Sequence, residues 1–430
     1  MKARPPAWQR GPAARLVKLL TWFVALGLST YLYVQPEIRD HFEDYLFDLR
    51  SRMKPKLQQI ADPVVVSMDQ NSLPVLAARL GITGLSTEEL FARVVHLLAQ
   101  PRFAIKHRVL LLFPNVFDYN SQRMQELRDL MLSPTHQPGD WFIGTLGYHG
   151  TTPFLRQFPE SLGGGLPVYS LDTGRKRSNA VVRRVPLTVF RADVEQPTLG
   201  YALASLDADL SAIRGREITI NYEPASAFTT VKAEDLLSAP ARFTNIMQGK
   251  TVIVGFTDFR RWPFQTYEKT TANTPLRSHP TDGHKRESIA YVTANIIENL
   301  THHRYLLPVD FLWQVGHVMV LSLLTWFLWH RSPLQGALWI FFGFPVLVYC
   351  NSLLMGIGGV YIPLADTLAL SMVGMVVGAF TSLERNLLRL ADERAEAQAG
   401  AQVAKLQARL LDSFTEELSS LTLNILAKVR

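Results

Sequence analysis

The hydrophobic and polar positions of this chain divide it into four long apolar segments and one large mixed segment. The apolar segments lie at residues 19–34, 311–329, 337–355 and 364–383. A helix needs ~20 apolar residues to cross a ~30 Å hydrocarbon core, and the last three segments approach that length. The first is shorter and basic in front, as in a secretory signal, but no small-residue cleavage site follows it, so we interpret it as an uncleaved anchor. The pattern predicts four transmembrane helices.

Boundaries follow from these segments. We predict a basic arm at 1–18, transmembrane helices at 19–34, 309–330, 335–356 and 364–383, an extracytoplasmic domain at 35–308 and a helical tail at 384–430.

The mixed segment has the pattern of an α/β domain, because short β-branched runs alternate with stretches of helical period. We predict strands at 63–69, 108–113, 141–144, 217–221 and 250–255. We predict helices at 87–99, 122–132, 200–210 and 289–302, the first with Ser86 as its N-cap. Continuously apolar strands between helices are typical of a sheet covered on both faces.

Two helices are expected where the domain meets the apolar segments. Residues 38–50 place apolar side chains at 38, 42, 45, 46 and 49, which is one face of a helix. This helix should extend the first span and dock on the domain through that face, and we interpret Asp48 and Arg50 in it as a structural ion pair. Residues 289–300 lead into the second span in the same way. The two base helices predict a mechanical link between domain and membrane.

The distribution of charge predicts the orientation in the membrane. The formal net charge is +7, and residues 1–34 supply five basic residues (Lys2, Arg4, Arg10, Arg15 and Lys18) and no acid. Positive charge is retained in the cytoplasm, so both termini should be cytoplasmic and the large domain periplasmic, in a bacterial inner membrane. Because most of the positive excess is explained by topology, we expect no nucleic-acid partner. The single cysteine, Cys350, lies in the third apolar segment and excludes an intramolecular disulfide.

Several stretches, taken in order, resemble a known family. They are Phe-Asp-Leu-Arg at 47–50, a valine-rich strand at 62–73, Arg-Arg-Val-Pro at 183–186, Gly-Lys-Thr-Val-Ile-Val-Gly at 249–255 and a closing helix at 293–300. This order is similar to the type-two CHASE domain, an extracellular sensing module associated with bacterial cyclases and histidine kinases. The resemblance covers about residues 37–383 and implies a sensory domain followed by three membrane helices. Members usually continue into an output domain, and none is present in this sequence.

Candidate ligand-binding residues lie in two places. Asp69 ends a strand and Ser72 follows it, so both could line a cleft at the carboxyl edge of the sheet, where open α/β sheets bind ligands. The alternative is that they cap the turn after the strand. Arg183 and Arg184 could bind an anion, or could pair with nearby acids.

Other chemistry is weakly indicated. The histidines at 279, 284, 302 and 303 lack the spacing of metal ligands, and the glycines at 163–165 do not form a phosphate-binding pattern. No catalytic constellation is visible, so we expect no metal, no cofactor and no enzyme activity.

The tail is expected to be one long helix, either continuous or broken at Gly400. Leu411, Phe414, Leu418, Leu421 and Ile425 follow a heptad seam, which predicts a coiled coil or a docking helix. The alternative is a solvated helix without a partner.

Two functions fit these features. The first is a bacterial inner-membrane sensor subunit, in which a periplasmic ligand or protein acts through the tail on a separate cytoplasmic protein or on a second copy of the chain. The second is a structural scaffold subunit of a larger envelope complex, which uses the sensory fold as a docking surface. Membrane lipid surrounds the spans in both.

Overall fold

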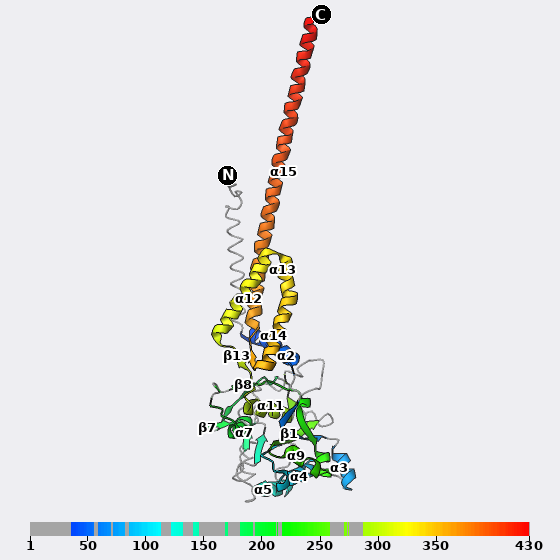
Figure 1. The fold of residues 1–430 in the computed structure, drawn as a ribbon, viewed down its shortest axis with the longest axis vertical. Helices are drawn as coiled ribbons and strands as arrows, with labels where there is room; N and C mark the ends of the chain where they lie inside the picture. Colours follow the sequence, from blue (N-terminus) through cyan, green and yellow to red (C-terminus); the bar gives the residue numbers. More distant parts are fainter. Residues whose placement is uncertain are drawn as a thin grey trace. The chain divides into compact units, whose positions relative to one another are not determined.

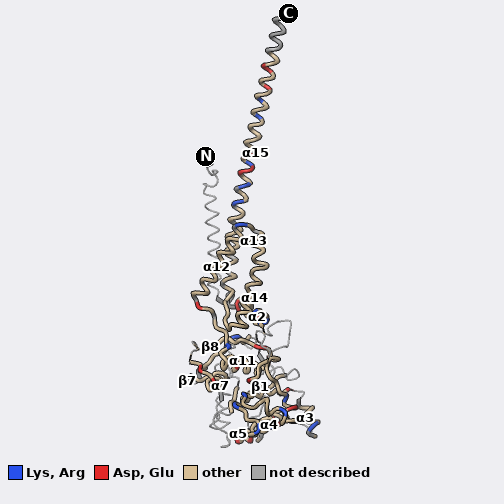
Figure 2. The backbone as a smooth tube through the Cα atoms, in the orientation of Figure 1, with Lys and Arg blue, Asp and Glu red and all other residues tan. Residues whose placement is uncertain are grey.

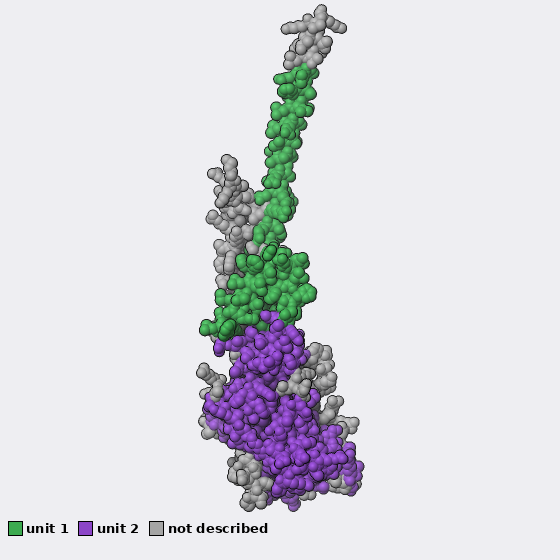
Figure 3. Space-filling model, in the orientation of Figure 1, with its two compact units in different colours: residues 1–40, 311–346, 364–430 green, residues 41–310, 347–363 purple. Residues whose placement is uncertain are grey.

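The computed structural model describes most of the chain from Pro36 to Val429. The residues it does not describe in that range are 56–58, 70–71, 82–85, 113–121, 132–140, 146–167, 171–180, 192–193, 212, 214–216, 259–270, 273 and 275–286. The chain forms two compact units, one of residues 1–40, 311–346 and 364–430 and one of residues 41–310 and 347–363 (Figure 3). The predicted basic arm and the predicted span at 19–34 lie outside the described residues.

The second unit is built on a six-stranded parallel sheet with the order β4-β3-β2-β10-β1-β9. The strands are β1 (Ile60–Asp69), β2 (His107–Leu112), β3 (Trp141–Thr145), β4 (Val168–Ser170), β9 (Phe228–Lys232) and β10 (Thr251–Asp258). Four of the predicted strands are therefore confirmed as members of this sheet. The strands β4 and β9 were missed, because the first has three residues and the second, Phe-Thr-Thr-Val-Lys, has little apolar sequence.

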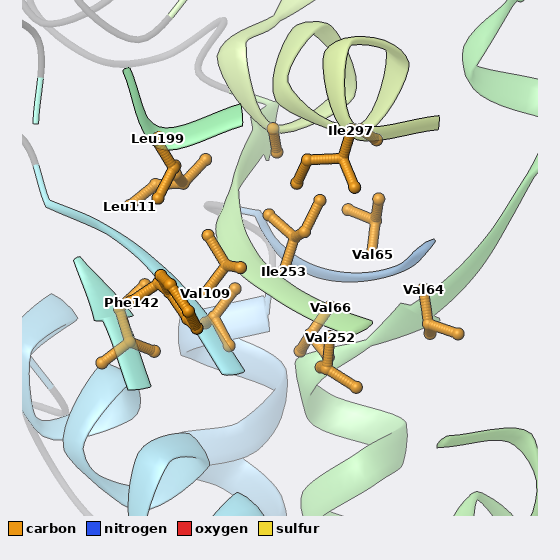
Figure 4. Close-up of a cluster of buried hydrophobic side chains, with 14 of the residues drawn as sticks. Val64, Val65, Val66, Val109, Leu111, Phe142, Leu199, Val252, Ile253 and Ile297 are labelled. Carbon is orange, nitrogen blue, oxygen red and sulfur yellow. The ribbon is translucent and has the colours of Figure 1, made fainter. Parts of the chain in front are cut away.

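Helices cover both faces of the sheet, as predicted. The helices α7 (Leu199–Asp207) and α11 (Ile289–Thr301) lie on one face, and α4 (Thr87–Leu98) and α8 (Ala233–Ser238) on the other. Figure 4 shows Val65 and Ile253 pointing towards Ile297 of α11, while Val66 and Val252 point to the opposite side. Because neighbouring residues of a strand face opposite sides, the continuous valine and isoleucine runs of β1 and β10 fill two cores at once.

Local sequence explains two features of this packing. Ser86 is the N-cap of α4, as predicted, and its Oγ accepts a hydrogen bond of 3.1 Å from the backbone N–H of Glu89. Gly255 in β10 lets α11 approach closely, since a Cβ there would lie 2.9 Å from the Cβ of Ala290. The α/β domain also contains the helices α3 (Ser72–Leu80), α5 (Gln122–Met131) and α9 (Thr244–Met247).

Short ribbons lie beside the main sheet. The predicted strand at 217–221 is β8 (Glu217–Thr219), which pairs antiparallel with β5 (Arg184–Pro186) and does not join the six-stranded sheet. Another ribbon joins β6 (Thr188–Arg191) to β7 (Val194–Pro197), and β11 (Thr271–Ala272) pairs with β12 (Glu287–Ser288). A last, parallel ribbon joins β13 (Leu307–Pro308) to β14 (Val360–Tyr361). The β13–β14 ribbon connects the chain on either side of the second and third apolar segments.

The predicted base helix is α2 (Pro36–Met53), but the prediction of its docking face was wrong in part. Leu46 and Phe47 are buried, whereas Phe42 is partly exposed and Tyr45 is 62% exposed. The buried side of α2 also carries Asp48 and Arg50, and the buried Lys54 directly follows the helix. A polar face, which apolar periodicity cannot detect, therefore docks this helix.

Two helices of the described residues are long and apolar enough to cross a membrane (Figure 1). Their apolar stretches, Leu312–Trp329 and Leu334–Gly358, match the second and third predicted spans. The first belongs to α12 (Phe311–Arg331), and the second runs through α13 (Pro333–Leu338), a π-helical turn (Trp339–Gly343) and α14 (Phe344–Gly358). The fourth predicted span is not among them and forms the first part of α15. Four transmembrane helices are therefore not supported by the structure.

The tail is a single helix, α15 (Ala365–Val429), of 65 residues. Gly400 does not interrupt it, so the structure has the continuous alternative. After Asp366 in its first turn, α15 has no charged residue until Glu384, and charged residues then recur along its length (Figure 2). At 1.5 Å per residue the helix is ~100 Å long.

Candidate functional site

The predicted residues Asp69 and Ser72 lie at the carboxyl edge of the sheet. Asp69 ends β1 and is paired by register with Asp258 of β10, and Ser72 is the first residue of α3. The helices that follow β1 and β10 cover opposite faces, so this edge is a topological switch point, where α/β sheets bind ligands. Among the described residues no three His, Cys, Asp or Glu side chains come together to hold a metal ion. A ligand at this edge stays a prediction.

The two predicted arginines have local acidic partners. Arg183 binds α2, with Nε and Nη2 each 2.8 Å from a carboxylate oxygen of Asp48 and Nη1 2.8 Å from Asp44. Arg184 makes an exposed pair of 3.4 Å with Glu217 on β8, and its side chain also hydrogen-bonds Tyr361. Arg183 therefore forms a bidentate ion pair with Asp48 and a further pair with Asp44, which together we call the clamp on α2. This is the pairing alternative that the sequence left open. The four predicted residues do not form one site.

A buried polar network on α2 was missed as a site. The side chain of Arg50 is 0% exposed, and its Nη1 donates to the carbonyl oxygen of Ile362 at 2.6 Å. Its Nε donates to the carbonyl of Leu46 at 3.0 Å, and Nη2 binds Glu43. Asp48 and Arg50 are therefore not partners of each other. Because Ile362 lies just before α15, Arg50 ties the base helix to the segment between the third and fourth apolar segments.

Lys54 extends the network at the end of α2. Its buried Nζ donates to Oε1 of Glu223 at 2.8 Å and also binds Oδ1 of Asn221. Burial lowers the pKa of Lys54 below its usual range, although the charge of Glu223 acts in the opposite direction. The ammonium group of Lys54 is buried and bound to one carboxylate oxygen and one amide oxygen. It is held in this position, because moving away from these oxygens would leave a charge unpaired in a low dielectric.

Two asparagines of α11 hold the extended segment that contains Asn221 and Glu223. Oδ1 of Asn299 accepts from the backbone N–H of Asn221 at 2.7 Å, and its Nδ2 donates to the carbonyl of Asn221 at 3.2 Å. In the same way, Oδ1 of Asn295 accepts from the backbone N–H of Glu223 at 2.7 Å, and its Nδ2 donates to the carbonyl of Glu223 at 3.1 Å. The two side chains are one helical turn apart and bind alternate residues of the segment, as a neighbouring strand would. We call residues 221–223 with these two asparagines the asparagine clasp.

The asparagine clasp also contacts the end of α14. Nδ2 of Asn221 donates to the carbonyl oxygen of Met355 at 3.4 Å. Nearby, Phe47 of α2 packs edge-to-face on Tyr361, with ring centroids 5.9 Å apart, in a small core with Leu306 and Met355. Asn221 therefore joins α2, α11 and α14 through its own backbone and side chain.

These contacts define the candidate functional site, which we call the base network: the clamp of Arg183 on α2, the buried cations Arg50 and Lys54, and the asparagine clasp. The network holds three separate parts of the chain together, namely α2, the α/β domain and residues 347–363. Its chemistry is suited to holding or shifting helices.

Part of the network had a signal in the sequence. The spacing of Asn295 and Asn299 puts both amides on one face of a buried helix, and α2 is rich in charge for a helix expected to dock. Nothing in the sequence indicated their partners, because Asn221, Arg183 and Ile362 lie far away along the chain.

The predicted partner-binding residues of the tail are exposed where their side chains are described. Leu411, Phe414 and Leu418 all lie on the surface of α15. Leu421 and Ile425 belong to the same helix, but their side chains are outside the description. The seam stays a prediction.

Comparison with known proteins adds no identification. No family model, curated protein or solved structure matches the chain. The resemblance to type-two CHASE domains stays a prediction.

Proposed function

We propose that this protein is a sensor or signal-transducing subunit of a bacterial inner membrane, in which the base network couples an α/β sensory domain to membrane helices. The chain would cross the membrane four times, at residues 19–34, 309–330, 335–356 and 364–383, with the domain in the periplasm and both termini in the cytoplasm. The apolar pattern and the basic N-terminal arm support this arrangement, and the two long apolar helices agree with its second and third crossings.

The base network is the observation that carries the proposal. A simple anchor needs only one covalent connection between a domain and its membrane helix. Here α2 and residues 347–363 are also bound through buried ions and directional hydrogen bonds, at Arg50 and Asn221. Buried polar contacts of this kind fix one arrangement and are lost together when it changes, which is a property of switches.

The tail would carry the change to an output protein. The exposed residues Leu411, Phe414 and Leu418 offer an apolar stripe for a cytoplasmic partner or a second copy of the chain. Because α15 is continuous from Ala365 to Val429, a shift at its first turns would be transmitted along a rigid element.

A single-cysteine experiment tests the coupling. Cys350 is replaced by serine, a cysteine is introduced at Leu411, and its labelling and cross-linking rates are measured in native membrane vesicles. Arg183→Met should change these rates about threefold or more, whereas Arg79→Met, which alters an exposed pair with Asp235 on α8, should leave them unaltered. Limited proteolysis establishes that the domain is folded in each variant. Unchanged rates in a folded Arg183→Met protein would overturn the proposed coupling.

Gentle purification separates the sensor from the scaffold. A free monomer or dimer supports the sensor. A stoichiometric envelope complex whose assembly is insensitive to Arg183→Met would support the structural function instead.

A further inference from the structure

The helix α2 is inverted relative to an ordinary surface helix of a soluble domain. Its buried side includes Asp48 and Arg50, which belong to the base network. Its exposed side carries the apolar residues Phe42, Tyr45 and Met53. Their spacing places the three side chains on one stripe of the helix. An ordinary amphipathic helix buries its apolar stripe and exposes charge, so the apolar stripe of α2 faces away from the domain that should cover it.

Exposed apolar side chains continue beside α2 on two other elements. The small core of Phe47, Leu306, Met355 and Tyr361 joins α2 to the ends of these elements. Leu307 of β13 and Leu354 of α14, which are sequence neighbours of members of this core, are exposed, and Ile357 of α14 is 81% exposed. We call the following residues the basal apolar surface: Phe42, Tyr45, Met53, Leu307, Leu354 and Ile357. Exposed apolar side chains gathered in one part of a protein mark a place of binding.

The position of the basal apolar surface on α14 indicates what covers it. Leu354 and Ile357 lie in the apolar stretch Leu334–Gly358, which is long enough to cross a membrane. The end of α2 is attached to the last turn of that stretch, because a Cβ on Gly356 would lie 2.7 Å from Cδ of Pro55, two residues after α2. The stripe of α2 therefore belongs to the region where a crossing helix leaves the hydrocarbon and meets the lipid headgroups.

The chemistry of the surface fits a phospholipid interface. Tyr45 combines an aromatic ring with a hydroxyl, and such side chains are enriched where hydrocarbon meets headgroups. Arg184 hydrogen-bonds Tyr361 of the small core and has an exposed side chain, in addition to its pair with Glu217. A guanidinium is suited to binding phosphate oxygens. An exposed cation beside an exposed apolar surface matches the two parts of a phospholipid, the phosphate and the acyl chains.

We propose that the basal apolar surface binds the phospholipid bilayer and seats α2 in the headgroup region of the periplasmic leaflet. This inference rests on the proposed function and names the bilayer surface as a partner of the base network. One side of α2 contacts lipid, and the other carries Asp48 and Arg50 of the network. A change in the lipid contact therefore acts on the network through a single helix. Phe42 and Tyr45, the part of the predicted docking face that the domain leaves exposed, are covered by lipid.

Spin labels on the full chain in nanodiscs of phosphatidylethanolamine and phosphatidylglycerol test the surface. Cys350 is replaced by serine, and single cysteines introduced at Tyr45, Met53 and Ile357 are labelled with a nitroxide. Collisions of each label with oxygen, which is concentrated in lipid, are compared with collisions with a water-soluble nickel chelate. The ratio of oxygen to nickel collisions should be about threefold or more above that at Leu206 of α7. Leu206 is the matched control, because it is 58% exposed and lies on the α/β domain.

Two substitutions test whether the side chains hold α2 in lipid. Tyr45→Asp puts a charge into the surface and should lower the ratio at a label on Met53 to that at Leu206. Tyr45→Trp keeps an amphipathic ring and should leave the ratio at Met53 unaltered. Limited proteolysis establishes that the domain is folded in both variants.

Three results would overturn the proposal. The first is a water-like ratio at Tyr45 and Met53. The second is an unaltered ratio at Met53 in a folded Tyr45→Asp variant. The third is magnetic broadening between labels at Tyr45 of two copies without a preference for oxygen, which would assign the surface to a second copy of the chain.

The outcome is separable from that of the proposed function. A chain that does not incorporate into nanodiscs overturns the membrane arrangement. If the chain incorporates but the labels at Tyr45 and Met53 lie in water, the lipid contact fails and the coupling is unaffected. If these labels report lipid but Arg183→Met leaves the tail unaltered, the lipid contact stands and the signalling function fails.

Discussion

The sheet core and the base network are held together by different physics. In the core, β1 and β10 bury valine and isoleucine on both faces, and the contacts are apolar and without direction (Figure 4). In the base network the contacts are charges and amides with fixed partners, such as Arg50 with Ile362 and Asn299 with Asn221. Apolar contacts do not depend on one particular partner, whereas a buried ion network leaves charges unsatisfied when a partner is lost. The difference shows which region provides stability and which is suited to transmit a change.

The largest effect is expected from a cavity in the core. Ile253→Ala should lower the free energy of unfolding by about 4 kcal/mol, within the usual range for deleting a fully buried isoleucine side chain. Denaturant unfolding of the domain, followed by intrinsic fluorescence, measures this loss. The exposed Val75→Ala is the control and should change stability by less than about 0.5 kcal/mol. Equal losses for the two variants would contradict the assignment of Ile253 to the core.

A smaller loss is expected at the clamp on α2. Arg183→Met removes the guanidinium that neutralises the buried Asp48 and should destabilise the protein by about 3 kcal/mol. The neighbouring Arg184→Met should cost at most about 1 kcal/mol, because its pair with Glu217 is exposed. Adding Asp48→Asn to Arg183→Met should recover part of the loss in a double-mutant cycle. Identical effects at positions 183 and 184 would remove the contrast between a buried clamp and a surface pair.

The asparagine clasp should give the smallest and most local effect. Asn299→Ala removes two hydrogen bonds to Asn221 and should cost about 2 kcal/mol. Hydrogen exchange should increase at residues 219–223 but not in β1 or β10, since the sheet does not depend on the clasp. Asn295→Ala should produce the same pattern around Glu223. A loss of protection spread over the whole sheet would show that clasp and core are one cooperative unit.

Much of the core could be predicted from the sequence. The valine run of β1, the matching run of β10 and the helical periods of α4, α7 and α11 each report burial through local composition. The two short strands β4 and β9 could not, because they are strands only through pairing with a neighbour. The same limit applies to β8, whose sequence is strand-like but whose partner is β5 and not the main sheet.

The base network could be predicted only in outline. The sequence indicated a base helix and a mechanical link, but the predicted docking face included Phe42 and Tyr45, which are exposed. Charged residues on a helix usually face solvent, and nothing local distinguishes Asp48, Arg50 and Lys54 from that ordinary case.

The sequence by itself determined the alternation of strands and helices, the apolar segments and the long tail, since these depend on periodicity and composition within short windows. Only the tertiary structure decided that Arg183 holds α2, that Arg50 reaches Ile362 and that Asn299 binds Asn221. The reason is physical: burial is a property of a residue and its neighbours in the chain, whereas the partner of a buried charge is chosen by the fold.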